Sequence, residues 1–465
     1  MSDLLTGGLE VVLATFAVSL ALRSYLAKPK LPHSGKLPPG PPLLPILGSA
    51  LAVDVTAPWL TYKAWGDQYG KSLHRVQDNI VINSERVARD LLEHRSQNYS
   101  DRPDIATNEL FGIDYTTAFM RYGSRWRLHR KIIHQSFRED AVPFFQPMQV
   151  TKSHEFLLNL LEDPLDYPKL FEVYSGSVIM SAVYSYDAAR RNDHMIERAV
   201  MALDIILKEM RPEVAAIFSA FPSLLRLPSW LPGMRLKRVS PLAKELATES
   251  LEKTICATGS ISSCMVSDHL LELDHSYGDS AWMKKAVKDS AATAFGAGTE
   301  TVGRKQQPMY NRKRTHLLIV WLAQRDCRHS TIVHPCPTLT LFYGSACGGA
   351  RFFPLAIMHA AVEDDVYEGY YIPKGATVTP NVWAMCHNED KYANASEFNP
   401  DRFLNPDGTL TDDTVSVVWG FGRRICPGRH LAEASIWSGM ATYAIPLQYH
   451  SAESGHGCHG LAAFD

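Results

Sequence analysis

The stretch Trp419-Gly-Phe-Gly-Arg-Arg-Ile-Cys426-Pro-Gly-Arg-His-Leu-Ala432 places one cysteine in a loop rich in glycine and arginine. The residues that follow predict an apolar helix, and the amides and dipole at a helix N-terminus favour a thiolate. Gly422 and Gly428 lack a Cβ, so the backbone can fold tightly beneath a flat ligand. Arg424 supplies a cation suited to a carboxylate. Cys426 is therefore a candidate axial thiolate ligand of haem iron, and the alternative is a buried structural cysteine.

The same stretch resembles the haem loop of the cytochrome P-450 family, whose pattern is Phe-x-x-Gly-x-Arg-x-Cys-x-Gly, with Trp419 in place of the usual phenylalanine. The resemblance covers roughly residues 1–302 and 354–440. It implies a single large, mostly α domain with a small β region. It also implies that Cys426 binds the iron of haem b, with Gly422 and Gly428 in the cofactor loop and Arg424 on a propionate.

Two further motifs agree with this resemblance. Ala297-Gly-Thr-Glu-Thr301 follows a helical run that begins near Met283, and it resembles the oxygen-activation motif of the family. A threonine hydroxyl in mid-helix can hold dioxygen or water while the neighbouring glutamate relays protons, so Glu300 and Thr301 are the candidate catalytic residues. Gly298 is expected to leave room for oxygen.

The segment Trp126-Arg-Leu-His-Arg130 places Trp126 and Arg130 on the same face of a predicted helix. In the family this pattern donates to a haem propionate; taken alone, the segment also fits a surface amphipathic helix. A basic face is also predicted, and it consists of Arg125, Arg127, Lys131, Arg423 and Arg429. This face either docks an acidic electron donor or is an ordinary solvated surface.

Composition agrees with a cytosol-facing enzyme on a membrane. Eight cysteines without a Cys-x-x-Cys pair indicate reduced thiols, and a net charge of −2 gives no reason to expect nucleic acid. Residues 1–26 predict an uncleaved, single-pass anchor, because the apolar run precedes the basic residues Arg23, Lys28 and Lys30. Residues 27–50 predict a stiff proline-rich linker. Residues 51–465 predict the monooxygenase domain. This domain would lie on the cytosolic face of the endoplasmic reticulum membrane.

Within that domain, residues 50–100 predict short strands and then a helix with Ser84 at its N-cap. Helices are expected from about Trp126 to Val302, and strands return between Gly369 and Val382. The proline-rich segment Phe221–Gly233, with its leucines and Trp230, predicts either a loop that dips into a membrane or an ordinary surface loop.

Two stretches depart from the family pattern. Residues 303–352 are strongly basic and include the helix breaker Pro308, and the tail from about 442 to 465 also loses the pattern. Either the internal segment is an insertion, or both stretches are mis-spliced. No Glu-x-x-Arg sequence remains upstream to pair with Arg402 of the Pro400–Phe403 element. An unpaired, buried Arg402 would cost several kcal/mol, so weak or absent haem retention is expected.

The resemblance extends to fungal microsomal members that oxidise secondary metabolites or aromatic compounds. It implies a haem-thiolate monooxygenase that takes electrons from NADPH through a partner reductase and acts on a small apolar substrate. Two alternatives remain open. One is a degenerate, non-functional haem-binding product; the other is a haem-thiolate isomerase or dehydratase.

Overall fold

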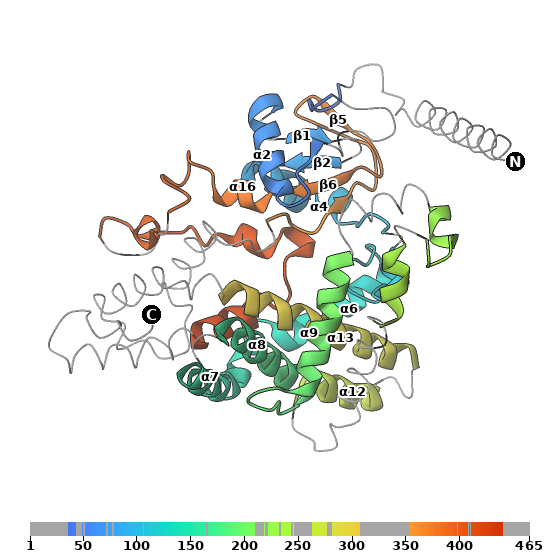
Figure 1. Cartoon of the computed structure of the whole chain (residues 1–465). Coiled ribbons are helices and arrows are strands. Elements are labelled where there is room, and N and C mark those ends of the chain that lie inside the picture. Colours follow the sequence, from blue (N-terminus) through green and yellow to red (C-terminus); the bar gives the residue numbers. More distant parts are fainter. Residues whose placement is uncertain are drawn as a thin grey trace, which may run out of the picture. The chain divides into compact units, whose positions relative to one another are not determined.

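The computed structural model divides the chain into two compact units, which are described here one at a time (Figure 1). Unit 1 comprises residues 1–103, 353–385 and 420–424, and unit 2 comprises residues 104–352, 386–419 and 425–465. The structure describes residues 36–42, 49, 52–70, 73–76, 79–105, 107–163, 166–209, 218, 222–231, 234–242, 245, 263–276, 281–306, 354–397, 399–407, 409 and 411–439. The side chains of residues 73–76, 167, 207, 222, 273–276, 300–306 and 400 lie outside this description.

Unit 1 contains a four-stranded sheet in the order β1-β2-β6-β3. Strands β1 and β2 pair antiparallel, β2 and β6 pair parallel with Ile80 opposite Val378, and β3 pairs antiparallel with β6. The apolar run at Ile80–Ile82 forms β2 as predicted, and its side chains are buried. The strands are β1 (Leu73–Val76), β2 (Asn79–Ile82), β3 (His359–Ala360) and β6 (Thr377–Pro380), and helix α2 (Pro58–Tyr69) precedes them.

A helical segment follows β2. It begins after Ser84, as predicted, although the Ser84 side chain makes no capping hydrogen bond. The first turns form α3 (Glu85–Arg89), the next turn is the π-helix η2 (Asp90–His94), and α4 (Ser96–Tyr99) ends the segment. A π-turn widens a helix locally and is frequent near functional sites.

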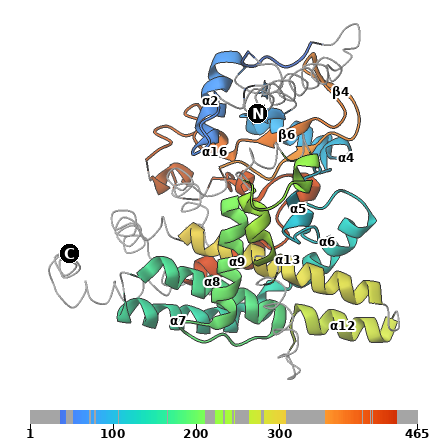
Figure 2. The ribbon, with the colours of Figure 1, turned by 45° about the vertical axis from the view of Figure 1, so that its right-hand side comes forward.

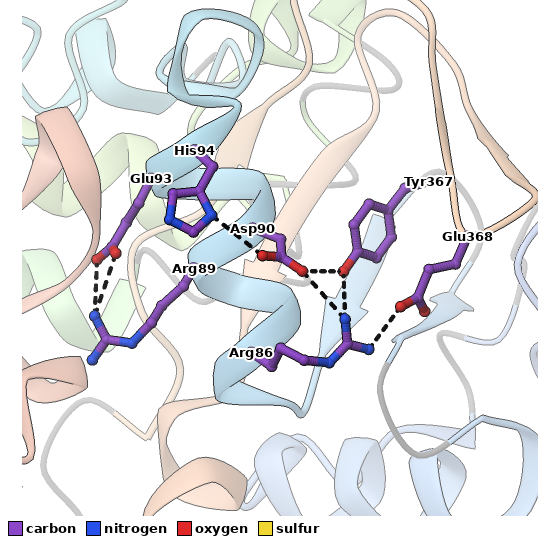
Figure 3. Close-up of polar contacts among 7 residues, drawn as sticks. All are labelled: Arg86, Arg89, Asp90, Glu93, His94, Tyr367 and Glu368. Atoms are coloured by element: carbon purple, nitrogen blue, oxygen red, sulfur yellow. Dashed lines mark hydrogen bonds and ion pairs between the residues drawn. The ribbon is translucent and has the colours of Figure 1, made fainter.

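A hairpin made by β4 (Asp365–Tyr367) and β5 (Tyr370–Ile372) contacts this helical segment. Its two turn residues, Glu368 and Gly369, both have positive φ, which a two-residue type I′ turn requires. Tyr367 donates a hydrogen bond to Asp90, and Arg86 pairs with both Asp90 and Glu368 (Figure 3).

The described part of unit 2 is mainly helical, with loops at 111–123 and through much of 387–415 (Figure 2). Its apolar core joins Ile133, Met180, Ile196 and Val287, which come from α6, α8, α9 and α13. The main helices are α6 (Ser124–Phe137), α7 (Gln146–Glu162), α8 (Tyr167–Tyr184), α9 (His194–Glu209), α12 (Met265–Ser276), α13 (Ala281–Gln306) and an unlabelled helix at 429–439. A mostly α fold with a small β region is thus confirmed.

Helix α13 packs closely on α8 at Gly298. A Cβ at Gly298 would lie 2.6 Å from the Ile179 side chain, and Ser175 donates a hydrogen bond of 2.6 Å to the Gly298 carbonyl. The expectation that Gly298 leaves room for oxygen is therefore wrong, because the space next to its Cα is taken by α8. The glycine serves helix packing instead.

Several predicted segments fall outside the description. The anchor at residues 1–26, most of the linker, residues 307–353 and the tail from residue 440 are not described. Helix α13 is described as far as Gln306, and Pro308 lies outside the described residues. Among the described helices, none has the length and apolar character needed to cross a bilayer.

The loop before α9 depends on one carboxylate. Asp193 accepts hydrogen bonds from the amides of Ala189, Met195 and Ile196 and from the Tyr186 hydroxyl. We expect Asp193→Ala to lower the free energy of unfolding by about 2 kcal/mol, because it removes a helix N-cap and orphans buried donors. Urea denaturation checks this.

The matched control is Asp204→Ala on the exposed side of α9, where the carboxylate pairs with Lys208 of the same helix. An exposed pair of this kind contributes less than about 0.5 kcal/mol. Equal losses in the two variants would contradict the role assigned to Asp193.

Candidate functional site

The cysteine loop closes on its own backbone in unit 2. The Cys426 amide donates a hydrogen bond of 2.8 Å to the carbonyl of Trp419, whose side chain is buried. Cys426 is partly exposed, and the helix at 429–439 begins three residues later. The sulfur therefore stands just before a helix N-terminus, as predicted, where the helix dipole favours the thiolate.

Buried hydrogen bonds from α7 and α8 hold this helix. Gln149 donates to the Leu431 carbonyl at 3.2 Å and to the Ser435 hydroxyl at 2.9 Å. Tyr174 donates to the Ser435 carbonyl at 2.6 Å. A buried polar group that loses its hydrogen-bond partner destabilises the fold. These contacts therefore fix the helix that orients Cys426.

Helix α6 brings Trp126 and Arg130 to one face, as their spacing predicted. Trp126 is buried against Tyr122, with ring centroids 5.0 Å apart. Arg130 donates to the carbonyl of Ile425, the residue before Cys426. Burial lowers the pKa of Arg130, and the charge of Cys426 opposes that shift. Arg130 thus reaches the cysteine loop, and the propionate role of this pair stays a prediction.

Gly422 belongs to unit 1 and is needed for a reason that the sequence did not reveal. Its φ is +50°, and a Cβ there would lie 2.2 Å from the Leu92 carbonyl oxygen in the π-helix η2. The glycine therefore lets the loop lie directly on the η2 backbone. Gly428 is different, because a Cβ there would meet no atom within 4 Å.

Unit 1 also gathers three basic side chains: Arg102 and His359 are buried, and Arg424 is partly buried. Arg102 donates to the carbonyls of Ile357 and Met358 at 2.9 and 2.8 Å. Burial and then Arg424 push the pKa of Arg102 well below its usual value, and Asp101 partly offsets them. Burial, Arg102 and Arg424 likewise lower the pKa of His359.

This donor set matches an anion that carries carboxylates. Guanidinium groups bind carboxylates through charge-assisted hydrogen bonds, often with two parallel N–H···O contacts. The two propionates of haem fit these residues. The sequence pointed to Arg424 only. His359 and Arg102 were missed because they meet through pairing of distant segments, and no local motif marks them.

The described helix α13 includes Glu300 and Thr301, so the helical placement of the acid–alcohol pair is confirmed. The side chains of both residues lie outside the description, and their catalytic roles stay predictions. The preceding Thr299 is buried, and its hydroxyl donates to the Phe295 carbonyl at 2.9 Å. In such a bond the threonine hydroxyl donates to a carbonyl one turn earlier in its own helix. The proton of the Thr299 hydroxyl is therefore already used in this hydrogen bond.

The expectation for Arg402 is wrong. Arg402 is only partly buried, and its guanidinium donates to three backbone carbonyls, those of Asn394, Glu397 and Asn399, at 2.9–3.2 Å. These carbonyls solvate the charge in place of a Glu-x-x-Arg partner. The physical reason given for weak haem retention therefore does not hold.

The predicted basic face is partly neutralised. Arg125 lies 3.2 Å from the Asp289 carboxylate on α13, and Arg127 stands over the Tyr122 ring at 5.7 Å. The role of this face in docking an electron donor stays a prediction.

Comparison with known proteins decides the family. The model of the family described as cytochrome P-450 matches residues 38–303 and 350–443. The chain belongs to the cytochrome P-450 family. The match stops and resumes close to the edges of the basic segment 303–352 and ends near the predicted tail, so the departure of these stretches from the family is confirmed.

Fungal cytochromes P-450 are similar along nearly the whole chain. Cytochrome P-450 monooxygenase 98 of Postia placenta is 32% identical over 94% of this chain and 88% of its own length. Cytochrome P-450 monooxygenase COX1 of Coprinopsis cinerea is 30% identical over 94% and 90%. Tryptamine 4-monooxygenase of Psilocybe cyanescens is 30% identical over 95% and 92%. The chain is accordingly an oxidoreductase of the monooxygenase type.

The two glycines of the cysteine loop provide a matched pair of variants. We expect Gly422→Ala to lower the free energy of unfolding by about 2 kcal/mol or more, because the new Cβ clashes with the Leu92 carbonyl and φ is positive. We expect Gly428→Ala to change it by less than about 1 kcal/mol, since its Cβ enters open space. Urea denaturation and haem content after purification measure both, and the reverse order would contradict this account of the loop.

Proposed function

We propose that this cytochrome P-450 is a haem-thiolate enzyme that inserts one atom of dioxygen into a small apolar organic substrate. Electrons come from NADPH through a partner reductase. The observation that carries the proposal is Cys426, held at a helix N-terminus by its bond to Trp419 and by the neighbouring contact of Arg130. A thiolate in this setting is the ligand that haem iron needs for oxygen chemistry.

When bound, haem supplies the iron that reduces and splits dioxygen. The chain's own residues hold and orient it. Cys426 presents the thiolate. In unit 1, the guanidinium groups of Arg102 and Arg424 receive carboxylates beside the buried His359, and Gly422 allows residues 420–424 to lie close to η2. In this proposal the Thr301 hydroxyl holds dioxygen or water, and the Glu300 carboxyl relays protons.

The substrate class is supported by similarity. The relative from Psilocybe cyanescens is named for oxidation of tryptamine, an aromatic compound. An aromatic or other apolar secondary metabolite is the substrate class that we propose for this chain. A binding screen with terpenoid, polyketide and polycyclic aromatic compounds would narrow it.

The structure also bears on the alternative of a degenerate product. That alternative was favoured by the missing Glu-x-x-Arg sequence, and haem content after purification tests it. Arg402 itself donates to carbonyls within its own loop, which weakens one physical argument for the alternative. An isomerase or dehydratase would turn over its substrate without NADPH. Dependence of product formation on NADPH and a reductase therefore separates the monooxygenase from that alternative.

We further propose that the chain acts at the endoplasmic reticulum membrane, on an anchor at residues 1–26. Apart from the anchor, the loop at 222–231 supports membrane contact, since Trp230 is 73% exposed and Leu227 is also exposed. Lys237 donates to the carbonyls of Leu225 and Leu227 and so orders this loop. Tryptophan at an exposed loop with apolar neighbours is typical of membrane interfaces.

Replacement of the thiolate tests the proposed chemistry. The native chain, reduced and exposed to carbon monoxide, should show an absorption band near ~450 nm, which reports thiolate ligation. Cys426→Ser should lose this band and NADPH-dependent product formation together. A Cys264→Ser variant, in which a buried cysteine outside the loop is changed, should keep both. Turnover that survives Cys426→Ser would overturn the proposal.

Two exposed tryptophans test membrane contact in the full chain. Bound to vesicles that contain brominated lipid, the protein should lose part of its tryptophan fluorescence. We expect Trp230→Phe to reduce the quenched fraction. Trp282→Phe, at a side chain 61% exposed at the start of α13, should leave it unchanged. Equal quenching in the native chain and Trp230→Phe would contradict insertion of this loop.

A further inference from the structure

Two consecutive backbone carbonyls orient the basic cluster of unit 1. The Tyr99 carbonyl lies 2.7 Å from His359 Nδ1, and the Ser100 carbonyl accepts from Arg424 Nε at 2.8 Å. Because a carbonyl only accepts, His359 Nδ1 carries a proton. Its Nε2 donates to a ligand carboxylate only when the ring takes up a second proton, which the negative charge of that carboxylate favours. Both side chains therefore take their direction from the end of α4.

Tyr99 is itself fixed by a carboxylate. Its fully buried side chain donates through the hydroxyl to Asp365 Oδ2 at 2.9 Å. Burial and then Asp365 raise the pKa of Tyr99, so the hydroxyl remains a donor. Arg95 Nη1 lies 2.9 and 2.8 Å from the two oxygens of Asp365 and donates to the Val366 carbonyl as well. Asp365 thus ties the ring of Tyr99 to strand β4.

The neighbouring contacts continue this attachment. Asn98 accepts from the amides of Val362 and Glu363, and the Ala360 amide donates to the Asp101 carbonyl at 2.9 Å. At the turn of the hairpin, Tyr367 and Glu368 hold Asp90 and Arg86 (Figure 3). Arg86 and Glu368 are largely exposed, and pairs of this kind contribute little to stability. The buried contact of Tyr99 is the one that leads directly to the basic cluster.

We propose that Tyr99, held by Asp365, is a positioning residue that sets His359 and Arg424 for binding a ligand with two carboxylates. The inference rests on the proposed haem binding, and the ligand carboxylates would be the propionates. Groups that orient the residues in contact with a ligand reduce the ordering cost of binding. Tyr99 touches no ligand in this proposal and acts only through its backbone neighbours.

The test compares porphyrins that differ only in their carboxylates. The haem-free full chain is titrated by fluorescence with protoporphyrin IX and with its dimethyl ester, which lacks the charges. The native chain should prefer the free acid. Tyr99→Phe keeps the ring and the carbonyl and removes only the bond to Asp365. We expect it to lower affinity for the free acid about fivefold, the effect of one ordinary hydrogen bond, and for the ester less than about twofold.

Tyr367→Phe is the matched control. It removes a hydroxyl from the same hairpin, one that contacts Asp90 and Arg86 but not Tyr99. Affinity for both porphyrins should stay within about twofold of the native chain. Equal losses for acid and ester in Tyr99→Phe, or the same selective loss in Tyr367→Phe, would overturn the positioning role and leave haem binding intact.

Other outcomes separate this inference from the proposed function. A native chain that binds both porphyrins equally well shows that the basic cluster does not receive carboxylates, and the inference fails. A native chain that binds neither porphyrin contradicts the haem-dependent function, and the inference fails with it. Asp365→Asn, which weakens the acceptor of the Tyr99 hydroxyl and removes the charge opposite Arg95, should reproduce the selective loss of Tyr99→Phe.

Discussion

The hydrogen bond between the Cys426 amide and the Trp419 carbonyl is the constraint on which the candidate site depends. It closes the loop so that the sulfur stands before the helix at 429–439, and Arg130 adds a second hold at the Ile425 carbonyl. Buried bonds from Gln149 and Tyr174 then fix that helix. The thiolate thus owes its place to one backbone hydrogen bond and to side-chain donors that reach backbone carbonyls on either side of it.

The sequence predicted this loop well because the information is local. Glycine, arginine and cysteine at fixed spacing specify the turn and the charge, and the i, i+4 spacing of Trp126 and Arg130 specifies a shared helix face. The close approach of Gly422 to Leu92 could not be seen, because it joins segments far apart in the chain. Long-range pairing likewise hides the cluster of Arg102, His359 and Arg424.

Arg402 shows where reasoning from a motif can fail. The absence of a Glu-x-x-Arg sequence is a fact of the chain, but a charged side chain does not require one particular carboxylate. Three carbonyls of residues 394–399 accept hydrogen bonds from its N–H groups instead, and the side chain keeps partial contact with solvent. A guanidinium has five donors, so a turn of well-placed carbonyls can satisfy much of it.

The break in the family match between residues 303 and 350 does not by itself remove the scaffold of unit 1. Strand β6 pairs in parallel with β2, and Asn381 donates to the Trp59 carbonyl and to Asn83, so residues after the break bond directly to residues far before it. The hairpin at 365–372 is likewise fixed by Arg95 and Tyr99.

These contacts need the right residues at 359–381 and at 59–101. The entropy cost of closing a loop grows only slowly with the length of that loop. A different sequence in the segment that connects residues 59–101 to residues 359–381 therefore changes the free-energy cost of pairing these residues only a little. The chain has no Glu-x-x-Arg sequence upstream of Arg402, and three carbonyls of residues 394–399 accept from its guanidinium group, so the charge is solvated by its own loop.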